Sequence, residues 1–93
     1  MSYELLFWPL ADEVLSKLEG SQSMSNVLAG VNRTLDRLAN DPYEPRLATR
    51  SFVTEQYGGV RATPVRVDTW YILWQPGESP RSIEIILIHA IDL

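Results

Sequence analysis

The clearest indication of the fold is the segment MSNVLAGVNRTLDRLAN, residues 24–40. Apolar side chains recur there every three or four positions, which places them in one stripe along about four turns of an α-helix. The stripe consists of Met24, Val27, Leu28, Val31, Leu35 and Leu38. The opposite side of the helix is polar and carries Asn32, Arg33, Asp36 and Arg37. An apolar stripe must be covered by another layer, so the remainder of the chain is expected to supply a sheet.

A strand and a shorter helix are expected before this segment. The aromatic and aliphatic run of residues 3–8 is typical of a strand. A helix then begins at Pro9, which lacks the N–H that the first helical turn leaves unpaired, and ends at Gly20. The longer helix stops near residue 40, because Pro42 disfavours the α conformation in the residue before it. The two helices form a hairpin with one apolar face.

Four further strands are expected in the second half of the chain. They are residues 47–53, 60–67, 70–75 and 83–91. Pro64 removes a ladder donor, which favours an edge position or a bulge, and Asp68-Thr69 is expected to form a two-residue hairpin turn. The order β-α-α-β-β-β-β predicts a single α+β domain over residues 1–93. Its two N-terminal helices pack on one face of a mainly antiparallel sheet and leave the other face partly open.

The composition indicates a small globular domain and argues against disulfides, metal centres and membrane-spanning segments. The 93 residues are 45% hydrophobic and 22% charged, near the average of globular chains. With no cysteine and one histidine, neither a disulfide nor a metal centre is expected, and no cofactor-binding motif occurs. No apolar run approaches about 18 residues, and the chain lacks a basic start, so neither a membrane span nor a signal peptide is expected. Cytoplasmic residence follows as the expectation.

The charge is unevenly distributed along the chain. The formal net charge is −4, and residues 1–45 carry all of it, with seven acids against three bases. Residues 46–93 hold five acids and five bases, and every one of these bases is arginine. Arginine is the side chain best suited to bidentate contacts with phosphate. A preference for arginine is explained equally well by genome composition.

Two side chains near the C-terminal strands are candidates for chemistry. His89 lies at the end of the last apolar strand, where it is either a structural residue with satisfied hydrogen bonds or a general acid or base. Trp70 and Trp74 share one face of their strand and are expected to pack in the core. Tyr71 falls on the other face, where a tyrosine can stack on a base or donate a proton.

The element order and four local patterns resemble the RelE/ParE superfamily of bacterial toxins. The patterns are the strand of residues 3–9 running into a helix, the helix end LDRLANDP at 35–42, the paired strands of residues 59–74, and the last strand of residues 85–89. The resemblance spans nearly the whole chain and implies the same α+β fold. It also implies a toxin of a type II toxin–antitoxin system, held inactive by a cognate antitoxin protein.

The resemblance implies one of two modes of growth inhibition. RelE-like members cut messenger RNA on the ribosome without a metal, with catalytic roles here for His89, Tyr71 and Arg61, whereas ParE-like members poison DNA gyrase. The expected RNA or target contacts are Arg46, Arg50, Arg66 and Arg81. Ala62 and Pro64 stand where RelE-like enzymes carry lysines, so the alternative is an inactive member that serves as a protein-binding module. An apolar sheet edge also allows a homodimer.

Overall fold

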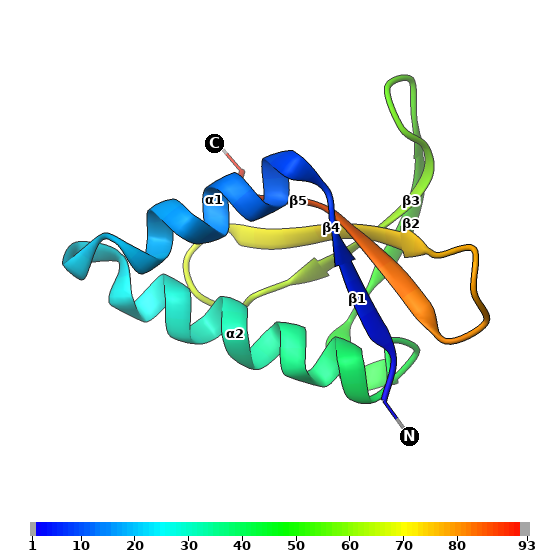
Figure 1. The fold of residues 1–93 in the computed structure, drawn as a ribbon, viewed down its shortest axis with the longest axis horizontal. Helices are drawn as coiled ribbons and strands as arrows, with labels where there is room; N and C mark the ends of the chain where they lie inside the picture. The colour runs from blue at the N-terminus through cyan, green and yellow to red at the C-terminus, as the bar shows by residue number, and fades with distance from the viewer. Residues whose placement is uncertain (1, 92–93) are drawn as a thin grey trace.

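The computed structural model of the protein describes residues 2–91. Its elements are β1 (Glu4–Phe7), α1 (Pro9–Glu19), α2 (Ser25–Asn40), β2 (Arg50–Thr54), β3 (Gly58–Pro64), β4 (Trp70–Pro76) and β5 (Ser82–Ala90). The strands form one sheet in the order β1-β5-β4-β3-β2 (Figure 1). β1 runs parallel to β5, and the other neighbours are antiparallel. The predicted α+β class and element order are therefore confirmed.

The two helices form a hairpin against one face of the sheet (Figure 1). The predicted stripe of α2 is buried at Val27, Val31, Leu35 and Leu38. The sheet meets the helices with a set of buried side chains: Val65, Ile72, Trp74, Ile83, Ile85 and Ile88. A β-bulge between Leu73 and Trp74 shifts the register against β5, so that Ile85 and Ile88 both point into this core. No helix within residues 2–91 is long and apolar enough to cross a membrane.

The core contains one buried polar chain, centred on Trp74. The Trp74 indole Nε1 donates to Thr63 Oγ1 at 2.8 Å, and this oxygen lies 2.6 Å from Thr49 Oγ1. Trp74 and Thr63 are both completely buried. A buried donor without an acceptor is costly, so this chain of hydrogen bonds fixes how β3 and β4 face the helices.

The connection between β3 and β4 differs from the prediction. β3 ends at Pro64 instead of residue 67, and residues 65–69 link it to β4. Arg66 and Asp68 have φ values of 67° and 50°, and a residue in this left-handed region cannot continue a strand. Asp68 and Thr69 still occupy the centre of a turn, since the Trp70 N–H donates to the Val67 carbonyl oxygen at 3.2 Å.

Two other predictions about the strands, the start of β2 and the placement of Pro64, can be compared with the structure. β2 begins at Arg50, three residues later than expected, because residues 45–47 form a short 3₁₀ helix that ends at Ala48 with φ 56°. The last pair between β2 and β3 joins Arg50 to Ala62. Pro64 therefore lies beyond the end of β2, where its missing N–H interrupts no ladder, although β3 itself is an interior strand between β4 and β2.

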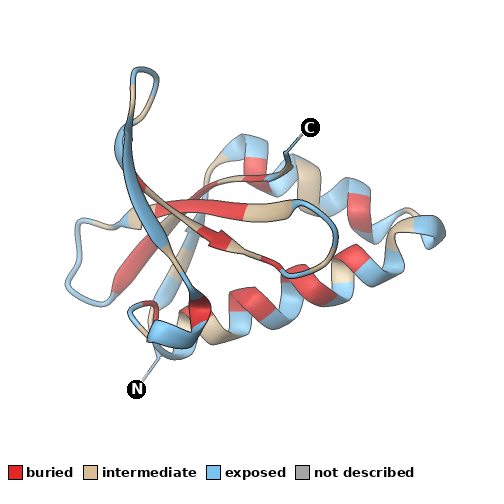
Figure 2. Cartoon of the chain, turned by 180° about the vertical axis from the view of Figure 1, so that it is seen from behind, coloured by how far each residue is buried: buried red, intermediate tan, exposed pale blue. Residues whose placement is uncertain are grey.

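The second face of the sheet is partly open, as predicted. It carries a smaller buried cluster of Val60, Leu73 and Ile86, and both α-helices lie on the other side. The β2–β3 hairpin projects away from the helices and is largely exposed (Figures 1 and 2). Near its tip, the Tyr57 ring packs edge-on against Trp8 with centroids 5.9 Å apart. We call this second surface the open face.

Candidate functional site

Tyr71 and His89 lie side by side on the open face. They are direct neighbours in the antiparallel pairing of β4 with β5. Their rings meet edge to face, with centroids 6.2 Å apart and an interplanar angle of 88°. Tyr71 is half-buried and His89 is exposed. Neither ring is enclosed in the core, and both are accessible to a molecule that approaches the sheet.

A cavity of about 480 Å³ adjoins Tyr71. Its lining comes mainly from β2, β3 and β4 and consists of Ala48, Arg50, Phe52, Ala62, Pro64, Tyr71 and Ile91. Arg50 lines this cavity, because it alternates with Ser51 and pairs with Ala62 on the open face. Phe52 adds an aromatic ring that is 42% exposed. Such a surface offers stacking partners for bases and one strong partner for phosphate.

Arg61 lies on the opposite face of the sheet from Tyr71 and His89. It pairs with Trp74 across β3 and β4, and its guanidinium carbon lies 5.4 Å from the centroid of the Trp74 ring. The Tyr43 ring holds the same guanidinium at 5.7 Å. Of the three residues predicted to act together, the structure brings together Tyr71 and His89 and directs Arg61 toward the helix side.

Two solved structures share this architecture almost end to end. A YoeB/ParE toxin from Agrobacterium tumefaciens has a TM-score of 0.75 at 8% identity, and the match covers 96% of this chain and 99% of that chain. The RelBE2 toxin–antitoxin complex from Mycobacterium tuberculosis contains a chain with a TM-score of 0.69 at 20% identity, covering 98% of this chain and 100% of that one. This chain has a RelE/ParE-like toxin fold. No family model and no curated protein sequence matches it.

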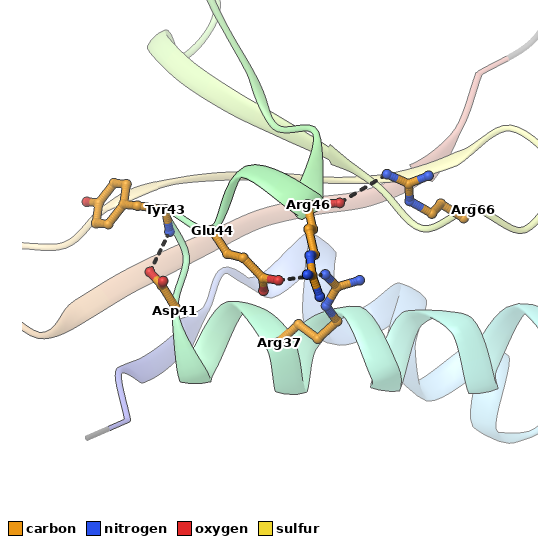
Figure 3. Close-up of polar contacts among 6 residues, drawn as sticks. All are labelled: Arg37, Asp41, Tyr43, Glu44, Arg46 and Arg66. Atoms are coloured by element: carbon orange, nitrogen blue, oxygen red, sulfur yellow. Dashed lines mark hydrogen bonds and ion pairs between the residues drawn. The ribbon is translucent and has the colours of Figure 1, made fainter.

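The RelE/ParE-like fold also gathers arginines at one end of α2. Arg66, in the connection between β3 and β4, donates from Nη2 to the Arg46 carbonyl oxygen at 3.1 Å (Figure 3). The Arg46 side chain extends toward α2, on the side of Arg37 (Figure 3). Arg37 pairs with Glu44 at 3.1 Å, and Arg33 lies one turn earlier on the same helix. We call Arg33, Arg37, Arg46 and Arg66 the arginine cluster.

The other arginine predicted to contact a target lies elsewhere on the fold. The Arg81 guanidinium carbon is 5.8 Å from the centroid of the Tyr3 ring, beside the start of β1. The structure therefore divides the predicted target-binding arginines among the open face (Arg50), the arginine cluster (Arg46 and Arg66) and this distant position. Sequence reasoning placed Arg33 and Arg37 only on the polar side of a helix. Their spacing of four residues was the available signal that they share a surface.

A carboxylate on the open face was missed by sequence reasoning. Glu84 Oε1 accepts hydrogen bonds from Trp8 Nε1 at 2.8 Å and from Gln75 Nε2 at 3.3 Å. These partners hold the carboxylate in place at the end of β5 remote from His89. Trp8 is 76 residues from Glu84 in sequence, so no local pattern joins the two. Residues 2–91 include no group of three acidic, histidine or cysteine side chains placed to hold a metal ion.

Proposed function

We propose that this protein is the toxin of a type II toxin–antitoxin pair and that it inhibits growth by cutting messenger RNA on the ribosome. The fold is that of the two toxin structures described above. The observation that carries the mechanism is the accessible pair of Tyr71 and His89 beside a cavity that contains Arg50. This arrangement combines two side chains that can transfer protons with a nearby arginine, whose side chain is positively charged.

The proposed reaction is an intramolecular transfer at phosphorus. His89 takes the proton of a ribose 2′-hydroxyl while the 2′-oxygen forms a bond to the adjacent phosphorus. The bond from phosphorus to the 5′-oxygen of the next nucleotide breaks, and the Tyr71 hydroxyl gives its proton to that oxygen. Arg50 stabilises the additional negative charge on the phosphoryl oxygens. The products are a 2′,3′-cyclic phosphate and a 5′-hydroxyl, and exchange with water restores both side chains.

A cognate antitoxin is the proposed protein partner. The RelBE2 structure is a complex of a toxin with its antitoxin, which supports a partner of that kind for a chain with the same fold. An antitoxin that covers the open face would block access to Tyr71 and His89. Because the proposed target is ribosome-bound messenger RNA, the cytoplasm is the proposed site of action.

Induction of this chain alone in a growing bacterium tests the proposal. We expect growth arrest and new RNA fragments with 5′-hydroxyl ends, and both effects should disappear with Tyr71→Phe or His89→Gln. Tyr43→Phe is the matched control, because Tyr43 is 53% exposed but lies beside Arg61, away from the open face. Arrest with unchanged RNA and lost gyrase supercoiling activity would refute RNA cleavage and favour gyrase poisoning.

A second function is favoured by the character of the cavity. Apart from Arg50 and the tyrosine hydroxyl, its lining side chains are apolar, including Ala62 and Pro64. The formal net charge of the chain is also −4, which is unfavourable for a polyanion. Both observations suit an inactive member of the fold that binds a protein. Normal growth with abundant soluble protein would select this alternative over the toxin.

A further inference from the structure

The arginine cluster is a strongly positive region on an acidic protein. It contains four of the eight lysines and arginines of the chain. The rest of the chain therefore carries a formal charge of −8, because the cluster contributes +4 to the net −4. Glu44 pairs with Arg37, and within residues 2–91 no ion pair joins Arg33, Arg46 or Arg66 to a carboxylate. The cluster has guanidinium donors to spare for an external anion.

A small pocket lies within the cluster. Its volume is about 40 Å³, and its lining consists of Arg33, Thr34, Arg37, Leu47, Pro64, Val65 and Arg66. Leu47 and Val65 are each 2% exposed and form an apolar floor. A pocket of this volume has room for about three water molecules. It is too small for a nucleobase and suits the oxygens of one phosphate group held by the surrounding guanidinium groups.

The position of Arg66 is fixed by its backbone and by one hydrogen bond. Its φ of 67° lies in the left-handed region, which is uncommon for a residue other than glycine. The hydrogen bond to the Arg46 carbonyl oxygen uses one of the five guanidinium N–H groups. Gly30 contributes to this arrangement, because α2 approaches Val65 and Val67 so closely that a side-chain carbon at position 30 would collide with both. The connection therefore presents a partly organised set of donors.

The pocket adjoins the proposed reaction site at Pro64. Pro64 lines both this pocket and the larger cavity, and it pairs with Tyr71 across β3 and β4. Tyr71 and Phe52 offer rings for base stacking on one side of Pro64. On the other side, the arginine cluster offers N–H groups that can donate hydrogen bonds to phosphate. This combination of stacking surfaces with an adjacent basic path suits single-stranded nucleic acid better than an acidic peptide.

From this geometry we infer that the arginine cluster binds a backbone phosphate of the RNA strand whose reacting nucleotide lies at Tyr71 and His89. The inference rests on the proposed function and adds a contact on the helix side of the molecule. An RNA strand that bends around Pro64 would reach both the arginine cluster and the reaction site at Tyr71 and His89. The acidic charge of the remaining surface disfavours other paths for the RNA. The contact would set the direction of the RNA across the open face.

Binding of a 2′-O-methyl RNA oligonucleotide, which has no free 2′-hydroxyl for the reaction, tests the inference. Anisotropy is measured over a series of salt concentrations for the unchanged protein, Arg33→Gln and Lys17→Gln. Lys17 is the matched control, since it is also an exposed helical cation but pairs with Glu13 on α1. Arg33→Gln should weaken binding about three- to tenfold and reduce the slope of log affinity against log salt by about 0.7. Lys17→Gln should leave both values unchanged.

A second variant and a second probe separate the remaining outcomes. Arg66→Asn, which keeps a residue tolerant of left-handed backbone, should weaken binding as Arg33→Gln does. Inorganic phosphate should shift the arginine side-chain NMR signals only at concentrations far above those of the RNA. Three results would overturn the inference. They are saturation of the arginine signals at phosphate concentrations as low as those at which the RNA binds, absence of RNA binding, and equal salt slopes for all variants.

The inference and the proposed function fail in different ways. RNA cleavage with equal salt slopes for all variants would remove the phosphate contact and leave the toxin mechanism intact. RNA binding that depends on Arg33, with no growth arrest and no cleavage, would support the phosphate contact and refute the toxin mechanism.

Discussion

Replacing Thr63 with valine should strongly destabilise the protein, because Thr63 is the acceptor that satisfies a buried indole. Valine has nearly the same shape, so Thr63→Val opens no cavity and isolates the loss of the hydroxyl. The Trp74 N–H now donates to Thr63 Oγ1 at 2.8 Å, and every buried side-chain nitrogen and oxygen within residues 2–91 has a hydrogen-bond partner. The substitution would leave one buried donor without an acceptor.

The size of the effect follows from the two contacts that are lost. Leaving the buried indole N–H unpaired costs about 1–3 kcal/mol, and losing the contact with Thr49 costs about 0.5–1.5 kcal/mol. Together they predict a decrease of about 1.5–4.5 kcal/mol in the free energy of unfolding. Single domains are stabilised by only about 5–15 kcal/mol. A loss of this size lowers the Tm of a domain this small by roughly 6–36 °C.

Urea unfolding followed by tryptophan fluorescence measures this change directly. Thr63→Ser is the matched control, because it keeps the hydroxyl and loses only a methyl group, at a cost of about 1 kcal/mol. Thr49→Val removes the outer partner alone and should have a smaller effect than Thr63→Val. If Thr63→Val unfolds within 0.5 kcal/mol of the unchanged protein, about the scatter expected of a surface substitution, the account of the Trp74 chain is wrong.

Three further predictions concern the open face and the contact between α2 and the connection from β3 to β4. His89→Gln should slow RNA cleavage about 10²–10⁴-fold in a reconstituted ribosome assay, while the circular dichroism spectrum stays unchanged; a misfolded variant would argue against the exposed position of His89. Trp8→Phe should lower the free energy of unfolding by about 1 kcal/mol through loss of the Glu84 hydrogen bond, and an unchanged urea midpoint would contradict it. Gly30→Ala gains about 1 kcal/mol of helix propensity but forces contacts of 2.6 and 2.9 Å on Val67 and Val65. Since overpacking costs about 1–3 kcal/mol, thermal unfolding should show net destabilisation. A raised Tm would show that the connection between β3 and β4 moves to accommodate the methyl group without strain.

The strands were predicted less accurately than the helices, for a local reason. Residues 60–67 contain enough β-branched side chains to read as one strand, yet β3 ends at Pro64. The left-handed backbone of Arg66 and Asp68 ends it, and neither residue is the glycine that normally marks such a position. Alternation placed Trp74 in the core correctly. It did not show that Arg61 pairs with Trp74, because cross-strand register depends on the turn between the strands.

The helical hairpin, the α+β class and the exposure of one sheet face could be predicted from the residues alone, because those features follow from the spacing of apolar side chains along neighbouring residues. The contacts between polar side chains could not be predicted in this way, because they form between distant segments of the folded chain. Tyr71 joins His89 through the pairing of β4 with β5, and Glu84 reaches Trp8 from the other end of the chain. The arginine cluster comes from one helix and two connections. Such contacts depend on register, crossover and close packing between distant segments, which no local periodicity encodes.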